Sequence, residues 1–130
     1  MIYSFLNGTE HSDFENVDFQ FTSGFSKAPY FYAYRKENIL YVRGIITYNG
    51  ILSSGITKIL DFDLGSSITG ASAYAFYLPC LYYATGATLN GTVQFIGGEL
   101  RTGRPTDYSK FGNPYLYING ATPIGLNGLD

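Results

Sequence analysis

The stretch that most constrains the fold is YRKENILYVRGIITYNG, residues 34–50, because its central part is apolar on both sides. Successive side chains of a β-strand point to opposite faces, so alternate residues form two sets. A strand that is apolar on both faces either lies between two layers or covers a core with one face and a partner with the other. The first set is Leu40, Val42, Ile46 and Tyr48, and the second is Ile39, Tyr41, Arg43, Ile45 and Thr47.

Short strands separated by turn residues are predicted along the whole chain. We expect a hairpin of residues 30–35 and 39–48, joined by the polar residues 36–38. The dipeptides Asn7-Gly8, Asn90-Gly91, Gly97-Gly98 and Asn119-Gly120 are read as turns, and residues 26–29 as a chain break. Further strands are predicted at residues 1–6, 14–23, 56–62, 72–85, 92–96, 99–102 and 115–118, the fourth of these bent or divided at Pro79.

This pattern predicts one all-β domain over residues 1–130. No amphipathic helix of useful length is visible, and turn signals recur at roughly the 8–12-residue spacing of sandwiches and barrels. The 16 glycines and the 18% content of aromatic residues suit strands joined by tight turns. We therefore predict a small antiparallel β-sandwich, jelly-roll-like, with little or no helix. Residues 1–29 are alternatively an N-terminal arm or a linker to an upstream region.

The tyrosines of the predicted hairpin indicate an interface. Tyr30, Tyr32 and Tyr34 share one face of their strand, and so much exposed aromatic surface is unusual in a soluble monomer. We expect an oligomer, with a homotrimer as the preferred form. A dimer or a second layer of the same chain explains the pattern nearly as well.

Charge, apolar runs and cysteine content exclude several classes of function. The formal net charge is −2 and no cluster of Lys and Arg occurs, so no nucleic-acid binding is expected. No apolar run approaches the roughly 18 residues of a membrane span, and no membrane insertion is expected. Cys80 is the single cysteine, which excludes an intrachain disulfide framework and predicts a buried thiol.

No catalytic residue, metal site or cofactor is predicted. His11 is the single histidine and has no visible partner in sequence. Asp61 and Asp63 share one strand face, but a glycosidase needs two carboxylates across a bond, and we expect solvated acids or a pair with Lys58 instead. A calcium site of Asp61, Asp63 and Glu10 is equally weakly supported, because the usual dense acidic loop is missing.

Three segments carry a family resemblance. Residues 34–50 are similar to the strand pair that opens the C-terminal head domains of bacteriophage tail-fibre and baseplate receptor-binding proteins. NGTVQFIGGELRTG, residues 90–103, resembles a late hairpin of those heads, and NPYLYING, residues 113–120, resembles their closing strand. The chain departs from the family in having no Trp and in matching its Leu-Pro element only at Leu78-Pro79.

The resemblance implies a non-enzymatic head domain of a phage tail tip or baseplate. Such heads are typically trimeric, act outside the cell as part of the virion, and bind bacterial cell-surface saccharide beside other tail or baseplate proteins. The alternative is a structural virion module that mediates protein–protein assembly. A polysaccharide depolymerase fragment is the third hypothesis, for which no convincing acid pair is present.

The candidate saccharide contacts lie in two segments. A sugar site needs an aromatic surface together with planar polar groups. The polar segment 103–114 follows a strand and suits a recognition loop. Two tyrosines before the turn ATGATLN complete the set, which is Arg104, Asp107, Tyr108, Lys110, Tyr82 and Tyr83.

Overall fold

The computed structural model describes residues 14–52, 55–64, 75–102 and 112–124. These residues form nine β-strands and contain no helix, so the predicted all-β class is confirmed. Among them there is accordingly no helix of the length and apolarity required to cross a membrane. The strands are β1 (Glu15–Asn16), β2 (Phe19–Phe21), β3 (Phe25–Lys36), β4 (Ile39–Tyr48), β5 (Lys58–Phe62), β6 (Phe76–Ala84), β7 (Ala87–Ile96), β8 (Glu99–Thr102) and β9 (Tyr115–Pro123).

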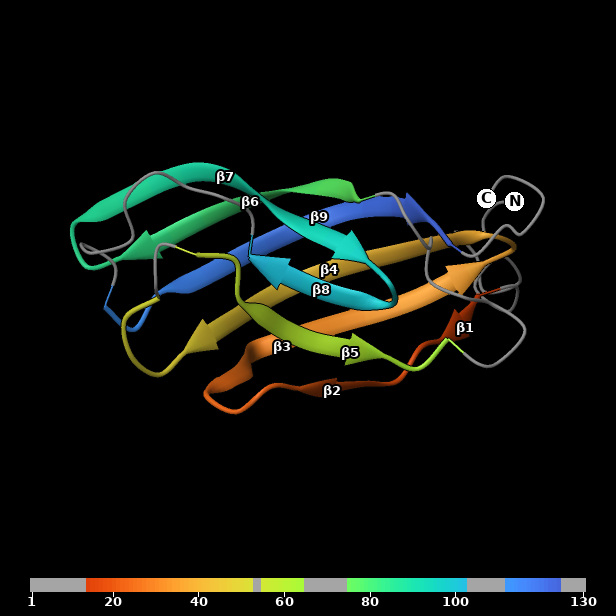
Figure 1. The fold of residues 1–130 in the computed structure, drawn as a ribbon, viewed down its shortest axis with the longest axis horizontal. Helices are drawn as coiled ribbons and strands as arrows, with labels where there is room; N and C mark the ends of the chain where they lie inside the picture. The colour runs from red at the N-terminus through yellow and green to blue at the C-terminus, as the bar shows by residue number, and fades with distance from the viewer. Residues whose placement is uncertain (1–13, 53–54, 65–74, 103–111, 125–130) are drawn as a thin grey trace.

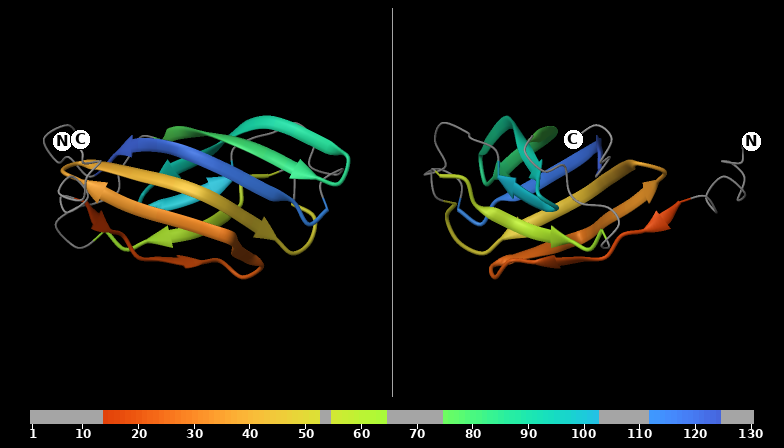
Figure 2. Two further views of the ribbon diagram at one scale, coloured as in Figure 1. Left: turned by 180° about the vertical axis from the view of Figure 1, so that it is seen from behind. Right: turned by 45° about the vertical axis from the view of Figure 1, so that its right-hand side comes forward.

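All nine strands belong to one antiparallel sheet that curls over on itself. Its order is β1-β3-β4-β9-β6-β7-β8-β5-β2. Figure 1 shows β5 and β8 in front of β4 and β9, and Figure 2 shows β3, β4, β9 and β6 side by side from behind. The hydrogen-bonded strands form one sheet, and the jelly-roll-like sandwich remains a prediction.

One short segment joins the two edges of the sheet. β1 pairs with β3, whereas β2, only two residues further along the chain, pairs with β5. The Val17 amide donates to the Ala33 carbonyl of β3, and the Asp63 amide donates to the Asp18 carbonyl, each at 2.8 Å. β1, β2 and the beginning of β3 therefore belong to the sheet, and residues 1–13 of the alternative arm or linker lie outside the described residues.

The predicted hairpin at residues 30–48 is confirmed, and it is longer than expected. β3 and β4 pair from Phe25↔Tyr48 to Lys36↔Ile39, with a register shift between Lys27 and Phe31. β3 continues through residues 26–29, contrary to the predicted chain break. Pro29 has no N–H to donate, but β1 does not extend along this part of β3, so no hydrogen bond to β1 is lost there. The positive φ of the turn, 56°, falls on Glu37.

The core is formed by the inward-facing members of each alternating set. On β4 these are Leu40, Val42 and Ile46 of the first predicted set, all fully buried. The largest fully buried side chains are Tyr82 on β6 and Phe95 on β7. Because this core draws on β3 through β9, the sheet curls around one continuous apolar cluster.

β6 continues through Pro79 as one strand, so the predicted division into two strands is wrong. Pro79 pairs with Thr92 of β7, whereas the register of β6 with β9 begins at Cys80. Pro79 therefore lies where pairing on one side of β6 ends, a position at which the missing N–H costs little.

Two of the predicted Asn-Gly turns are wrong. Asn90-Gly91 lies inside β7 and Asn119-Gly120 lies inside β9. A Cβ at Gly91 would come within 3.1 Å of the Tyr82 ring, and one at Gly120 within 2.8 Å of Leu78. These glycines make room for buried side chains, whereas Gly97-Gly98 forms the predicted turn between β7 and β8.

The outer surface of the curled sheet has two different halves. On β4, β9 and β6, Arg43 is the one charged residue among the outward-facing side chains. On β5 and β8 the outward-facing side chains are charged and paired, with Lys58–Asp61 at 3.0 Å and Arg101–Glu99 at 2.9 Å. The fold thus separates an aromatic half from a charged half.

Candidate functional site

The predicted recognition segment is only partly described. Arg104, Asp107, Tyr108 and Lys110 lie outside the described residues, and the chain is described again from Gly112. There Asn113 makes two hydrogen bonds with Gly50 of the neighbouring turn. The Asn113 backbone N–H donates to the Gly50 carbonyl at 2.7 Å, and the side-chain Oδ1 of Asn113 accepts from the Gly50 backbone N–H at 2.9 Å. The end of the predicted loop is therefore fixed at one end of the sheet.

The two tyrosines predicted as saccharide contacts, Tyr82 and Tyr83, point in opposite directions. Tyr82 is fully buried, and its hydroxyl donates to the Thr92 carbonyl at 2.7 Å, so it is a core residue. Tyr83 is 40% exposed on the outer surface, where its ring meets that of Tyr115 edge to face at 6.4 Å. Of this pair, only Tyr83 can contact a ligand on the surface of the chain.

A polar depression lies where the predicted loop rejoins the sheet. It measures about 250 Å³ and combines hydroxyl and amide groups with two tyrosines. The Ser26 and Thr47 hydroxyls are hydrogen-bonded to each other at 3.1 Å across β3 and β4. We call it the end depression; it is lined by Gly24, Ser26, Thr47, Tyr48, Asn49, Asn113 and Tyr115.

A larger groove crosses the outer face of β6, β7 and β9. It measures about 430 Å³, and its side chains are apolar or amide-bearing, without any charged group. Sequence reasoning missed it, because Asn90 and Asn119 were both interpreted as turn residues. We call it the amide groove; it is lined by Pro79, Cys80, Leu81, Asn90, Gly91, Tyr117 and Asn119.

Two tyrosines of β9 connect the end depression with the amide groove. Tyr115 lines the former and Tyr117 the latter. Their ring centroids are 6.4 Å apart and their planes differ by 24°. Because residues two apart on a strand share a face, both rings stand on the outer surface, where they are 42% and 39% exposed.

The hairpin tyrosines extend this aromatic surface across β3. As predicted, Tyr30, Tyr32 and Tyr34 share one face, and the rings of Tyr30 and Tyr32 stack at 5.5 Å. Six of the eight large apolar side chains that are exposed among the described residues are tyrosines of β3, β6 and β9. Exposed apolar surface is thus concentrated on one half of the molecule.

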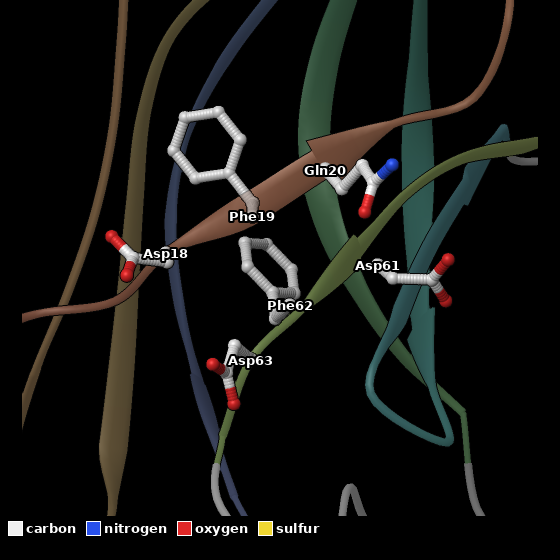
Figure 3. A pocket seen from close by; sticks show the side chains of 6 residues that line it. All are labelled: Asp18, Phe19, Gln20, Asp61, Phe62 and Asp63. Atoms are coloured by element: carbon white, nitrogen blue, oxygen red, sulfur yellow. The ribbon is translucent and has the colours of Figure 1, made fainter.

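A third depression, on the charged half, contains the acid pair considered for catalysis (Figure 3). It measures about 360 Å³ and is lined by Asp18, Phe19, Gln20, Asp61, Phe62 and Asp63. The carboxylates of Asp61 and Asp63 point in different directions in Figure 3, and Asp61 accepts a hydrogen bond from Lys58 at 3.0 Å. That bond is the main reason why the pKa of Lys58 is raised.

The expected pairing of these acids with Lys58 is therefore confirmed for Asp61. Within the described part of the chain, no group of three or more His, Cys, Asp and Glu side chains is arranged to hold a metal ion. Glu10, the third member of the calcium alternative, and His11 lie outside the described residues.

The single cysteine is a core residue, as predicted. Cys80 is 4% exposed and carries a free thiol. Burial away from water raises its pKa, because the thiolate would be poorly solvated there. Cys80 is among the residues that line the amide groove, yet it is buried and belongs to the core cluster.

Comparison with known proteins identifies a structural relative. No protein-family model matches the sequence, and no curated protein matches it. The head domain of the lactococcal phage bIL170, a receptor-binding domain, superimposes with a TM-score of 0.66 and 17% sequence identity. The match covers 86% of this chain and 99% of that domain. In its fold, the chain is similar to the receptor-binding head domain of a lactococcal phage.

Proposed function

We propose that the chain is a non-enzymatic receptor-binding head domain of a phage virion. The fold shared with the bIL170 head domain over 99% of that domain is the observation that carries this proposal. The role is adhesion to a host cell, and it places the domain on the outside of the virion, at a tail tip or baseplate beside other tail proteins.

The proposed ligand is a saccharide of the bacterial cell surface. Saccharide recognition needs aromatic surface and hydrogen-bonding groups in a largely preformed site. The end depression supplies both, from Tyr115 and from the Asn49 and Thr47 side chains. We include Tyr83, which contacts Tyr115, and the loop residues Arg104, Asp107, Tyr108 and Lys110, whose segment ends beside this depression.

The proposed assembly is a homotrimer that covers the tyrosines of β3. Tyr30 and Tyr32 are 40% and 56% exposed, and burying such rings between subunits stabilises an oligomer. Sedimentation or light scattering gives the solution mass. Three chains per particle support this assembly, and a monomer with the same adhesion activity contradicts it.

An assembly role without receptor binding is the second candidate. It is favoured by the same exposed tyrosines, which suit a protein partner as well as a sister subunit. Its distinguishing property is tight binding to a baseplate protein together with no adsorption to cells.

Adsorption of the fluorescently labelled domain to host bacteria tests the receptor role. We expect binding that free surface polysaccharide inhibits and that Tyr115→Ala weakens at least tenfold. Tyr77→Ala is the matched control, since Tyr77 is an exposed tyrosine of β6 that lines neither the end depression nor the amide groove. A folded domain that adsorbs to no strain, or whose adsorption polysaccharide leaves unchanged, contradicts the proposal.

A further inference from the structure

The end depression and the amide groove lie in one line along β9. Tyr115, Tyr117 and Asn119 occupy successive outward-facing positions, two residues or about 6.8 Å apart. Tyr115 lines the first depression, whereas Tyr117 and Asn119 line the second. A ligand that follows β9 therefore passes from one to the other without crossing a charged side chain.

The amide groove has the chemistry of a sugar site in its own right. Tyr117 pairs with Leu81 of β6, and Leu81 pairs with Asn90 of β7, so an aromatic ring and an amide flank an apolar floor. Asn119 adds a second amide beside Tyr117 on the same strand. Each amide offers both donors and an acceptor, as a sugar hydroxyl requires.

We propose that the outer face of β9 binds an uncharged oligosaccharide, with one sugar unit at Tyr115 and a following unit in the amide groove. This inference rests on the proposed saccharide-binding function and adds the length and charge of the ligand. The two rings are nearly parallel and 6.4 Å apart, so a chain laid along β9 meets two exposed aromatic side chains in succession.

The absence of charge from the amide groove determines which sugars fit. Its lining side chains carry no cation or anion, so the acidic group of a sugar inside the groove would lose hydration without gaining an ionic partner from the lining. The nearest charged residue in the β-sheet register is Arg43, which pairs with Asn119 from β4. The paired charges of Lys58, Asp61, Glu99 and Arg101 belong to the other half of the molecule.

Titration calorimetry with defined oligosaccharides tests the proposal. The probes are neutral glucose, galactose, rhamnose and N-acetylglucosamine series of one to six units, with oligogalacturonates as the acidic series. We expect affinity for at least one neutral series to rise tenfold or more from one to three units. We expect Tyr117→Ala to reduce trisaccharide affinity roughly five- to tenfold and leave monosaccharide affinity unchanged.

Variants separate a binding role from a structural one. Asn119 is exposed, and Asn119→Ala should reduce the increase of affinity with oligosaccharide length in the same way as Tyr117→Ala. Tyr77→Ala is the control and should bind like the parent. If Tyr117→Ala instead changes the solution mass with unchanged binding, the ring belongs to a subunit interface and the proposal is wrong.

The remaining outcomes distinguish this inference from the function on which it rests. Binding that is independent of length, or strongest for oligogalacturonates, overturns the proposed subsite and leaves saccharide recognition in place. No binding to any series, together with no adsorption to cells, overturns both.

Discussion

The hydroxyl of the fully buried Tyr82 donates a hydrogen bond to the Thr92 carbonyl at 2.7 Å. Thr92 lies on β7 one position beyond the end of the register with β8, which stops at Val93↔Thr102, and Tyr82 supplies a donor to its carbonyl. Between them, Gly91 leaves the space that the ring of Tyr82 occupies. Gly91, which looks unsuited to a strand interior, thus makes room for the buried Tyr82 ring.

Tyr82→Phe removes that donor and keeps the ring. We expect the free energy of unfolding to fall by about 0.5–1.5 kcal/mol, because the partly buried Thr92 carbonyl loses a hydrogen-bond donor. Urea unfolding followed by fluorescence measures the change. Tyr117→Phe, at an exposed ring, is the control and should lie within about 0.5 kcal/mol of the parent. Equal effects of the two substitutions would show that the buried bond contributes nothing.

Gly44→Ala should prevent folding or reduce stability severely. Gly44 has a φ of +143°, and a Cβ there would lie 2.5 Å from the Phe31 Cα and the Tyr30 carbonyl oxygen. Gly86→Ala is the matched control, since its φ of +79° is also positive but no atom lies within 4 Å of the added Cβ. We expect Gly86→Ala to cost about 1 kcal/mol. Comparable soluble yields and melting temperatures of the two variants would contradict this explanation.

The buried thiol makes stability depend on alkaline pH. Below about pH 8.5 the Cys80 thiol is protonated in both the folded and the unfolded chain. Above that pH only the unfolded chain loses the proton, because burial raises the pKa in the folded protein, so the free energy of unfolding falls. The contribution approaches about 1.4 kcal/mol per pH unit. Urea titrations from pH 7 to 10 should show a shallower slope for Cys80→Ala, and identical slopes would exclude the effect.

The closure of the sheet depends on apolar contact more than on charge. Phe19 of β2 packs edge to face on Phe31 of β3 at 5.0 Å, while Glu15 and Arg35 form an exposed ion pair at 2.8 Å. We expect Phe19→Ala to cost about 2 kcal/mol, less than a fully buried Phe would. A double-mutant cycle on Glu15 and Arg35 should give a coupling of about 0.2–1 kcal/mol. A larger coupling than the Phe19 effect would reverse this ranking.

The local pattern predicted the strands where alternation was clear. In residues 30–48 the period of two identifies the two strands and the two sets of side chains that share a face, since it depends only on neighbouring side chains. The pattern failed at Asn90-Gly91, at Asn119-Gly120 and at Pro79. At the two Asn-Gly pairs the deciding factor is a side chain from another strand, Tyr82 for Gly91 and Leu78 for Gly120. At Pro79 it is the point at which pairing of β6 with β9 ends.

The candidate site was harder to predict for a similar reason. The end depression gathers residues from three separate segments, around Ser26, Thr47 and Asn113, and only the last lay in the predicted loop. Which residues meet across strands depends on register, which a single sequence does not specify. Tyr82 and Tyr83 illustrate the limit, because alternation predicts opposite faces but does not identify the outer one.

The segment that joins β1 to β2 links the behaviour of the two sheet edges. On the β3 edge, the Val17 amide of this segment donates to the Ala33 carbonyl. On the β5 edge, the Asp18 carbonyl of the same segment accepts from the Asp63 amide. When the stretch detaches, both bonds break in a single local opening. Their amide hydrogens should then exchange with deuterated solvent at a common rate, although they belong to opposite ends of the strand order.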